Sequence, residues 1–290
     1  MRHLRLLGPL LLLAAAPAQP QAHPALWKLA DADTTIYLFG TIHILPAGTN
    51  WMGPAIKHAV DGAQSLTIET VLDQDPSKVA TILMTTGTAK GLPPLVERVP
   101  AAKRAQLAAL VKSSGFPPQM LDGMKSWAAA IMLTGAALSQ IGVDAAASPG
   151  VEPQLTALFR AAGKPVDGLE TPEQQLGFFN QLPESAQRAF LVATLDSPEK
   201  ARAEFREMIG AWSRGDPEAI QRAFDKDPEF TPALRDLLIR QRDRNWADTL
   251  AKRLDQPGTL FVAVGAGHLV GPDSVQAMLA KKGLKVERVD

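Results

Sequence analysis

Two histidines near opposite ends of the chain follow the same pattern of residues. An apolar run stops at Gly40, and His43 comes three residues after that glycine. A second apolar run stops at Gly265, and His268 again comes three residues later. Ligands of open α/β sheets bind just beyond the carboxyl ends of the strands. We therefore expect both histidines to lie at one edge of one sheet and to share a site.

Acidic residues stand at the ends of other predicted strands. Glu69 ends the apolar strand at residues 65–70, and Glu170 follows the short strand at residues 165–169. A charge at the end of an apolar strand is costly unless it is paired or bound to a cation. Glu152 opens a helix, where the helix dipole alone would favour an acid, so both a structural and a functional role stay open for it.

Imidazole and carboxylate groups together are the ligands of catalytic divalent metal sites. Three protein ligands can leave one coordination position open for water. The chain contains no cysteine, so a thiolate site is excluded. The same atoms without a metal could act as a general base with an orienting acid.

A predicted helix that begins at Pro232 carries polar residues on its expected buried face. At 100° per residue, Gln241, Arg242 and Asn245 lie on the stripe that also holds Leu238. Arg242 would hold a carboxylate or bind an anionic substrate group, and Asn245 would hydrogen-bond to substrate or to a ligand side chain. The alternative is a partly solvated helix whose arginine extends into solvent.

The elements that must position these residues predict an α/β fold with a central mixed sheet. Residues 34–70 read as strand, helix and strand, and residues 259–289 repeat that order. Between these βαβ units, residues from about 75 to 255 are mainly helical. We expect one domain over residues 23–290, with a large helical insertion.

The first 22 residues read as a secretory signal peptide rather than as part of the fold. A short basic start precedes the apolar run at residues 6–16, and an A-x-A cleavage site follows at residues 16–18. Ala22 is a second cleavage option, and an uncleaved N-terminal anchor is the alternative. The expected location is periplasmic or secreted, with no transmembrane segment after signal removal. The formal net charge of zero disfavours nucleic-acid binding.

The chain resembles the TraB/GumN (Tiki-like) family in five segments, at residues 37–46, 66–69, 169–175, 244–246 and 261–269. This resemblance implies kinship with erythromycin-esterase-like and haem-binding ChaN-like proteins. Members with known activity resemble divalent-metal-dependent peptidases that act on secreted or extracellular proteins. By motif, His43, Glu69 and His268 would form the core of the site, with Arg242 or Asn245 in support.

Three hypotheses of function follow. The first is a periplasmic metal-dependent hydrolase, a metallopeptidase for exported proteins or peptides. In it His43 and His268 bind Mn²⁺, Co²⁺ or Zn²⁺, with Glu69 or Glu170 as a ligand and the other glutamate as general base. The second is a metal-independent, erythromycin-esterase-like hydrolase that uses His43 with Glu69. The third is a non-enzymatic protein that binds haem or another ligand. The paired acids favour the first, because haem binding would not need them.

Overall fold

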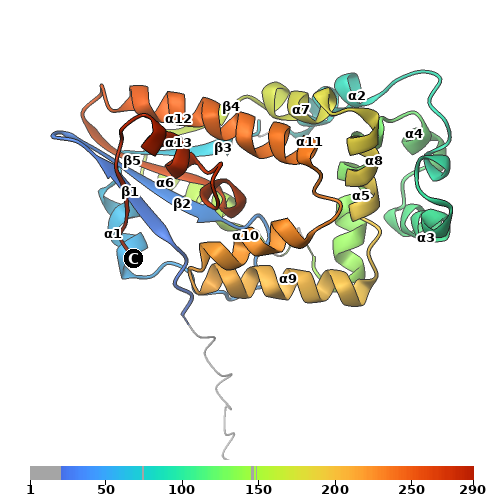
Figure 1. Cartoon of the computed structure of the whole chain (residues 1–290), viewed down its shortest axis with the longest axis horizontal. Coiled ribbons are helices and arrows are strands. Elements are labelled where there is room, and N and C mark those ends of the chain that lie inside the picture. Colours follow the sequence, from blue (N-terminus) through green and yellow to red (C-terminus); the bar gives the residue numbers. More distant parts are fainter. Residues whose placement is uncertain (1–20, 74, 145–146, 148) are drawn as a thin grey trace, which may run out of the picture.

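The computed structural model describes residues 21–73, 75–144, 147 and 149–290 of the 290-residue chain. Its strands form one six-stranded sheet in the order β4-β3-β5-β2-β1-β6 (Figure 1). The strands are β1 (Leu26–Ala30), β2 (Thr34–Thr41), β3 (Ser65–Thr70), β4 (Val166–Glu170), β5 (Gly258–Gly265) and β6 (Val286–Arg288). Neighbours from β4 to β2 are parallel, whereas β1 is antiparallel to both β2 and β6. The predicted α/β class with a mixed sheet is confirmed.

The central strands β2 and β5 are apolar over most of their length, as expected where helices cover both faces of a sheet. Phe39 and Phe261 pack on one face in a cluster that includes Trp212. Leu38 and Val262 point to the other face, where Trp246 covers them. The helices that supply most of these two layers are α1 (Pro54–Gly62), α6 (Val151–Ala161), α9 (Pro198–Ser213), α10 (Pro217–Lys226), α12 (Gln241–Arg253) and α13 (Val275–Lys281).

The helical insertion builds a hydrophobic core of its own. Trp127 and Leu133 of α5 are fully buried against Leu107 and Leu191, and no strand residue belongs to this cluster. Figure 1 shows this part of the chain beyond one end of the sheet. Its elements are α2 (Pro76–Gly87), η1 (Leu95–Arg98), η2 (Ala101–Lys103), α3 (Arg104–Ser114), α4 (Pro118–Asp122), α5 (Ser126–Gln140), α7 (Pro172–Gln181) and α8 (Glu184–Ala193).

The helices that return to the sheet begin where the sequence indicates. Ser197, Asp216 and Thr231 each cap a helix with a side-chain oxygen that accepts a backbone N–H, and a proline follows each cap. The last of these caps opens α11 (Pro232–Arg235), which runs through the π-helical turn η3 (Asp236–Arg240) into α12.

Two features of the sheet differ from the expected βαβ pattern. The strand β1 is additional, and it pairs with β2 over five residues on one side and with β6 on the other. The Asp31 side chain holds the turn between β1 and β2 by accepting the N–H groups of Asp33 and Thr34. The strand β5 lies between β2 and β3, although β2 and β3 are close in sequence. The strand β5, from near the C-terminus, therefore separates β2, which leads to His43, from β3, which carries Glu69.

The predicted signal peptide lies almost wholly outside the described residues, which begin at residue 21. Ala22, the second cleavage option, is buried, and its N–H donates to the carbonyl of Asn50 over 2.8 Å. None of the helices in the described ranges combines the length and the apolar character needed to cross a membrane.

Candidate functional site

Four neighbouring parallel strands deliver the candidate residues to one edge of the sheet. In the order β2, β5, β3, β4 they carry His43, His268, Glu69 and Glu170 at or just beyond their carboxyl ends. The register aligns these ends, since Thr41 of β2 lies opposite Gly265 of β5. The sequence-based expectation that both histidines lie at one edge is therefore met by adjacent strands.

The two histidines do not occupy equivalent positions, although their motifs match. In the β2–β5 ladder, Gly40 lies opposite Val264 and not opposite Gly265, so the motifs are offset by one residue. His43 follows β2 in a loop and its side chain is 71% exposed, whereas the side chain of His268, in the turn η4 (Ala266–Leu269), is 7% exposed. One imidazole therefore faces solvent, and the other forms the floor of the site.

Glu152 orients His43. The Nδ1 atom of His43 lies 2.8 Å from Oε1 of Glu152, which also accepts a hydrogen bond of 2.5 Å from the hydroxyl of Thr41. The start of α6 packs tightly on the loop after β2, where a Cβ at Gly150 would lie 2.3 Å from backbone atoms of His43. The hydrogen bond to Glu152 raises the pKa of His43 to about 9. Glu152 therefore has a role in the site beyond the helix dipole.

Asp243 orients His268 in the same way. Its Oδ1 lies 2.5 Å from Nδ1 of His268, and Asp243 itself is fully buried. Burial raises the pKa of Asp243 to about 6, although its bond to His268 opposes this rise. A carboxylate can only accept, so in both pairs Nδ1 of the imidazole carries a proton, and Nε2 is the ring nitrogen that faces the site.

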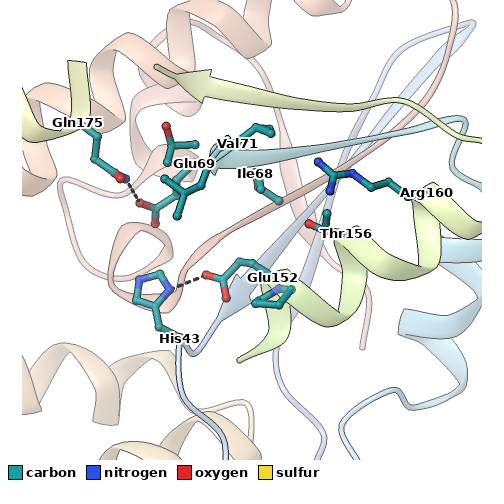
Figure 2. A pocket seen from close by; sticks show the side chains of 11 residues that line it. His43, Ile68, Glu69, Val71, Glu152, Thr156, Arg160 and Gln175 are labelled. Atoms are coloured by element: carbon teal, nitrogen blue, oxygen red, sulfur yellow. Dashed lines mark hydrogen bonds and ion pairs between the residues drawn. The ribbon is translucent and has the colours of Figure 1, made fainter. Parts of the chain in front are cut away.

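Glu69 lies between the two imidazoles as a fixed anion. Its Oε1 accepts the N–H of Gly265 at 2.7 Å, and its Oε2 accepts Arg242 Nη2 at 2.7 Å and Gln175 Nε2 at 3.1 Å. Nε2 of His268 lies 3.7 Å from Oε1. Burial alone would raise the pKa of Glu69, but the charges of His268, Arg242 and His43 lower it to about 2. Figure 2 shows Glu69, held by Gln175, facing His43.

Glu170, predicted as a metal ligand or general base, lies behind Arg242 and not among the groups that face the cavities. Arg242 Nε and Nη2 donate to its two oxygens at 2.9 and 3.0 Å, and Trp246 Nε1 donates at 2.8 Å. Neither cavity beside the site reaches Glu170. A general base needs access to substrate or water, so this carboxylate serves to hold Arg242.

Arg242 lies in the site, but Asn245 does not. Arg242 is buried and contacts Glu69, Glu170 and Nε2 of His268, the last over 3.2 Å. Asn245 is exposed, which corrects its expected place on the buried seam. The residue that joins Arg242 on the buried face is Asp243.

The π-helical turn η3 explains this difference. A π turn holds one more residue than an α turn, so it moves the buried face of everything after it by one position. The expected stripe at residues 241, 242, 245 and 249 moves by one position to residues 242, 243, 246 and 250, which are all buried, as is Ala247. A 3.6-residue period cannot reveal such a turn, and no sequence signal marked Asp243.

Two cavities meet at the site. One has a volume of about 390 Å³ and lies along α6, with Thr156, Arg160 and Gln175 in its wall (Figure 2). The other has a volume of about 350 Å³ and lies against α9, α10 and η3. His43 and Glu69 line both cavities, so a molecule in either one contacts the same pair.

Imidazole and carboxylate groups are the kinds of donor from which divalent metal sites are built. Histidine ligands commonly bond their second ring nitrogen to a carboxylate, as His43 and His268 both do here. Gly265 leaves the space between the donors open, because a Cβ there would lie 3.0 Å from Glu69 Oε1 and 3.7 Å from His43 Nε2. As the side chains are placed, no three His, Asp or Glu residues of the described ranges stand close enough to bind one ion, and Arg242 occupies Nε2 of His268.

Comparison with known proteins gives the family of the chain. The TraB/PrgY/gumN family profile matches residues 25–288, and the chain belongs to this family. It is 26% identical over 271 residues to the uncharacterized protein YbaP of Escherichia coli K12, covering 92% of this chain and 96% of YbaP. The YbaP protein of Shigella flexneri matches to the same extent. No solved structure matches the chain.

Proposed function

We propose that the protein is a divalent-metal-dependent hydrolase of exported peptides or proteins. The observation that carries this proposal is the matched orientation of the two imidazoles. Each is fixed through Nδ1 by a carboxylate, and each turns Nε2 toward the buried anion of Glu69 at the meeting point of two cavities. Nε2 of His43, Nε2 of His268 and Glu69 would hold the ion.

A bound divalent ion would lower the pKa of a water molecule and polarise a carbonyl group. The chain supplies the rest of the site. Glu152 and Asp243 fix the two rings, and the Gly265 N–H fixes one oxygen of Glu69. Arg242 holds the other oxygen of Glu69 and must release Nε2 of His268 when that atom binds the ion. Exposure of His43 leaves the site open to a large substrate.

We extend the proposal to the compartment, which we take to be the periplasm or the cell exterior. The N-terminal sequence supports it through its basic start, apolar run and A-x-A site. Burial of Ala22 favours cleavage after Ala18, because cleavage after Ala22 would remove a core residue. N-terminal sequencing of the exported protein tests the cleavage site. A mature chain that starts at His23 would contradict cleavage after Ala18.

Metal content tests the central proposal. The protein is purified without chelators, and its metal is measured in the wild type and in His43→Ala, His268→Ala and His58→Ala. His58 is an exposed histidine of α1 and serves as the control. We expect both site variants to lose the metal and to lose hydrolysis of a peptide library with Mn²⁺, Co²⁺ or Zn²⁺ added. If both hold as much metal as the wild type, the metal site is wrong.

A metal-independent hydrolase is the second candidate. The bond between Arg242 Nη1 and Nε2 of His268 favours it, because it engages His268 without an ion and leaves the His43–Glu152 pair to face the substrate. Chelator-resistant hydrolysis that disappears in His43→Ala would support this candidate over the first.

A further inference from the structure

The cavity of about 350 Å³ has two walls of opposite character. One wall is the candidate site, which contributes His43, Glu69, Arg242 and His268. The other wall is apolar and comes from α9, α10 and η3. Its residues are Phe205, Met208, Ile209, Phe224 and Ile239.

The apolar wall is only half-buried. Met208, Ile209 and Phe224 pack on their inner side against the core cluster of the sheet, yet all of the wall residues keep part of their surface exposed. Apolar surface that faces a cavity beside a polar site is the usual composition of a ligand pocket, and the volume lies in the usual range of about 300–1,000 Å³. The energy gained by covering it favours an apolar group.

The charged groups that line the cavity all belong to the candidate site and already have partners of opposite charge there. Arg242 pairs with Glu69, and His43 pairs with Glu152. A charged group against α9 and α10 would lose water without gaining a partner. A bulky neutral side chain therefore fits this cavity best.

The second cavity indicates that the ligand is an extended chain. It shares His43 and Glu69 with the first cavity, but its wall carries Thr156 and the exposed cation Arg160. A molecule that occupies both cavities must cross the His43–Glu69 pair, with one group on each side. A peptide does this naturally, because successive side chains project from one backbone with about 3.3 Å between residues.

We propose that the cavity between α9, α10 and η3 is the specificity pocket of this enzyme, and that it binds a bulky apolar side chain of a peptide beside the bond that is cleaved. This proposal rests on the proposed hydrolase function and names its substrate class. The residues that set the preference are Ile209, Phe224 and Ile239 of the apolar wall.

Peptides that differ at a single residue next to the cleaved bond test the preference. We expect kcat/KM for phenylalanine or leucine to exceed that for alanine by about tenfold or more, and aspartate to be the poorest. Ile209→Trp, which fills the cavity, should abolish the preference for phenylalanine and leave cleavage of the alanine peptide. Ile239→Trp repeats the test from η3, another element of the apolar wall, if the first variant does not fold. Leu158→Trp, at an exposed leucine of α6, is the control and should keep the preference.

A binding measurement separates this proposal from the proposed function. Calorimetry with N-acetylphenylalaninamide and N-acetylalaninamide requires no catalysis. If the phenylalanine probe binds more tightly and Ile209→Trp removes the difference, the pocket stands even where no peptide is hydrolysed, and the hydrolase proposal fails alone. If peptides are hydrolysed in a His43-dependent way without any apolar preference, the pocket proposal is overturned. Hydrolysis of a long-chain acyl ester in preference to every peptide, with the same dependence on Ile209, would also overturn it.

Discussion

Glu170 offers the sharpest test of the geometry, because the sequence and the structure assign it different roles. It is buried and accepts hydrogen bonds from Arg242 and Trp246. Removal of one partner of a buried ion pair costs about 3–5 kcal/mol, a large part of the roughly 5–15 kcal/mol by which domains are stable. Glu170→Ala should therefore lose about 3–5 kcal/mol. Glu170→Gln keeps one oxygen acceptor and should lose about 1–3 kcal/mol.

Urea unfolding followed by tryptophan fluorescence measures these losses. With a slope of about 3 kcal/mol per molar urea, the Glu170→Ala loss moves the midpoint down by about 1–2 M. Glu173→Gln, at an exposed acid in the first turn of α7, is the control and should change stability by less than about 0.5 kcal/mol. Glu170→Gln should retain hydrolysis when folded. A variant that keeps its midpoint and loses hydrolysis would show that Glu170 acts as a base, and would refute the geometry.

Three further predictions concern the other parts of the site. Gly265→Ala should lower kcat/KM by about 100-fold with little change in melting temperature, because the new Cβ lies 3.0 Å from Glu69 Oε1 and displaces it. Asp243→Asn should lower metal affinity or kcat/KM by about 10–100-fold, whereas Asn245→Ala, two residues on, should leave both unchanged in the same assays. In metal-free protein, the lowered pKa of Glu69, about 2 against an ordinary 4.5, stabilises the fold above pH 4.5, and this stability is lost as the pH falls toward 2. The stability difference between wild type and Glu69→Gln should shrink over that interval in urea titrations, and a difference that stays constant would contradict the assigned environment.

Most of the sheet was predictable because its strands are buried on both faces. The runs that became β2, β3 and β5 are apolar and end at glycine or an acid, and the structure places their bounds within one residue of the expected ones at 34–40, 65–70 and 259–264. The short strand β1 gave no comparable signal, since it includes Lys28 and three of its five residues are partly or fully exposed. The order of the strands was not predictable from local patterns, because pairing of β5 with β2 and β3 is a long-range choice.

The site residues at strand ends were predictable from the sequence. Those on α12 were not all predictable, because the π turn changes which residues of that helix face the core. His43, Glu69 and His268 follow directly from apolar runs that end in polar residues. Arg242 was found because it stays on the buried face with or without the π turn. Asp243 was missed and Asn245 was wrongly included for the same reason, a shift of one residue at η3.

The position of β5 makes the site depend on the whole chain. His43 and Glu69 lie on strands that do not touch each other, since β5 separates them. Only when β5 pairs with both strands does the N–H of Gly265 reach Glu69 and does His268 come within 3.7 Å of it. Those contacts close a loop of about 200 residues. Closing so long a loop costs conformational entropy, so the contacts form slowly unless other structure is already in place. The helical insertion has its own core, and its folding before the sheet closes would shorten that loop in effect. The site should therefore be among the last parts of the molecule to assemble, after the insertion has brought the two ends together.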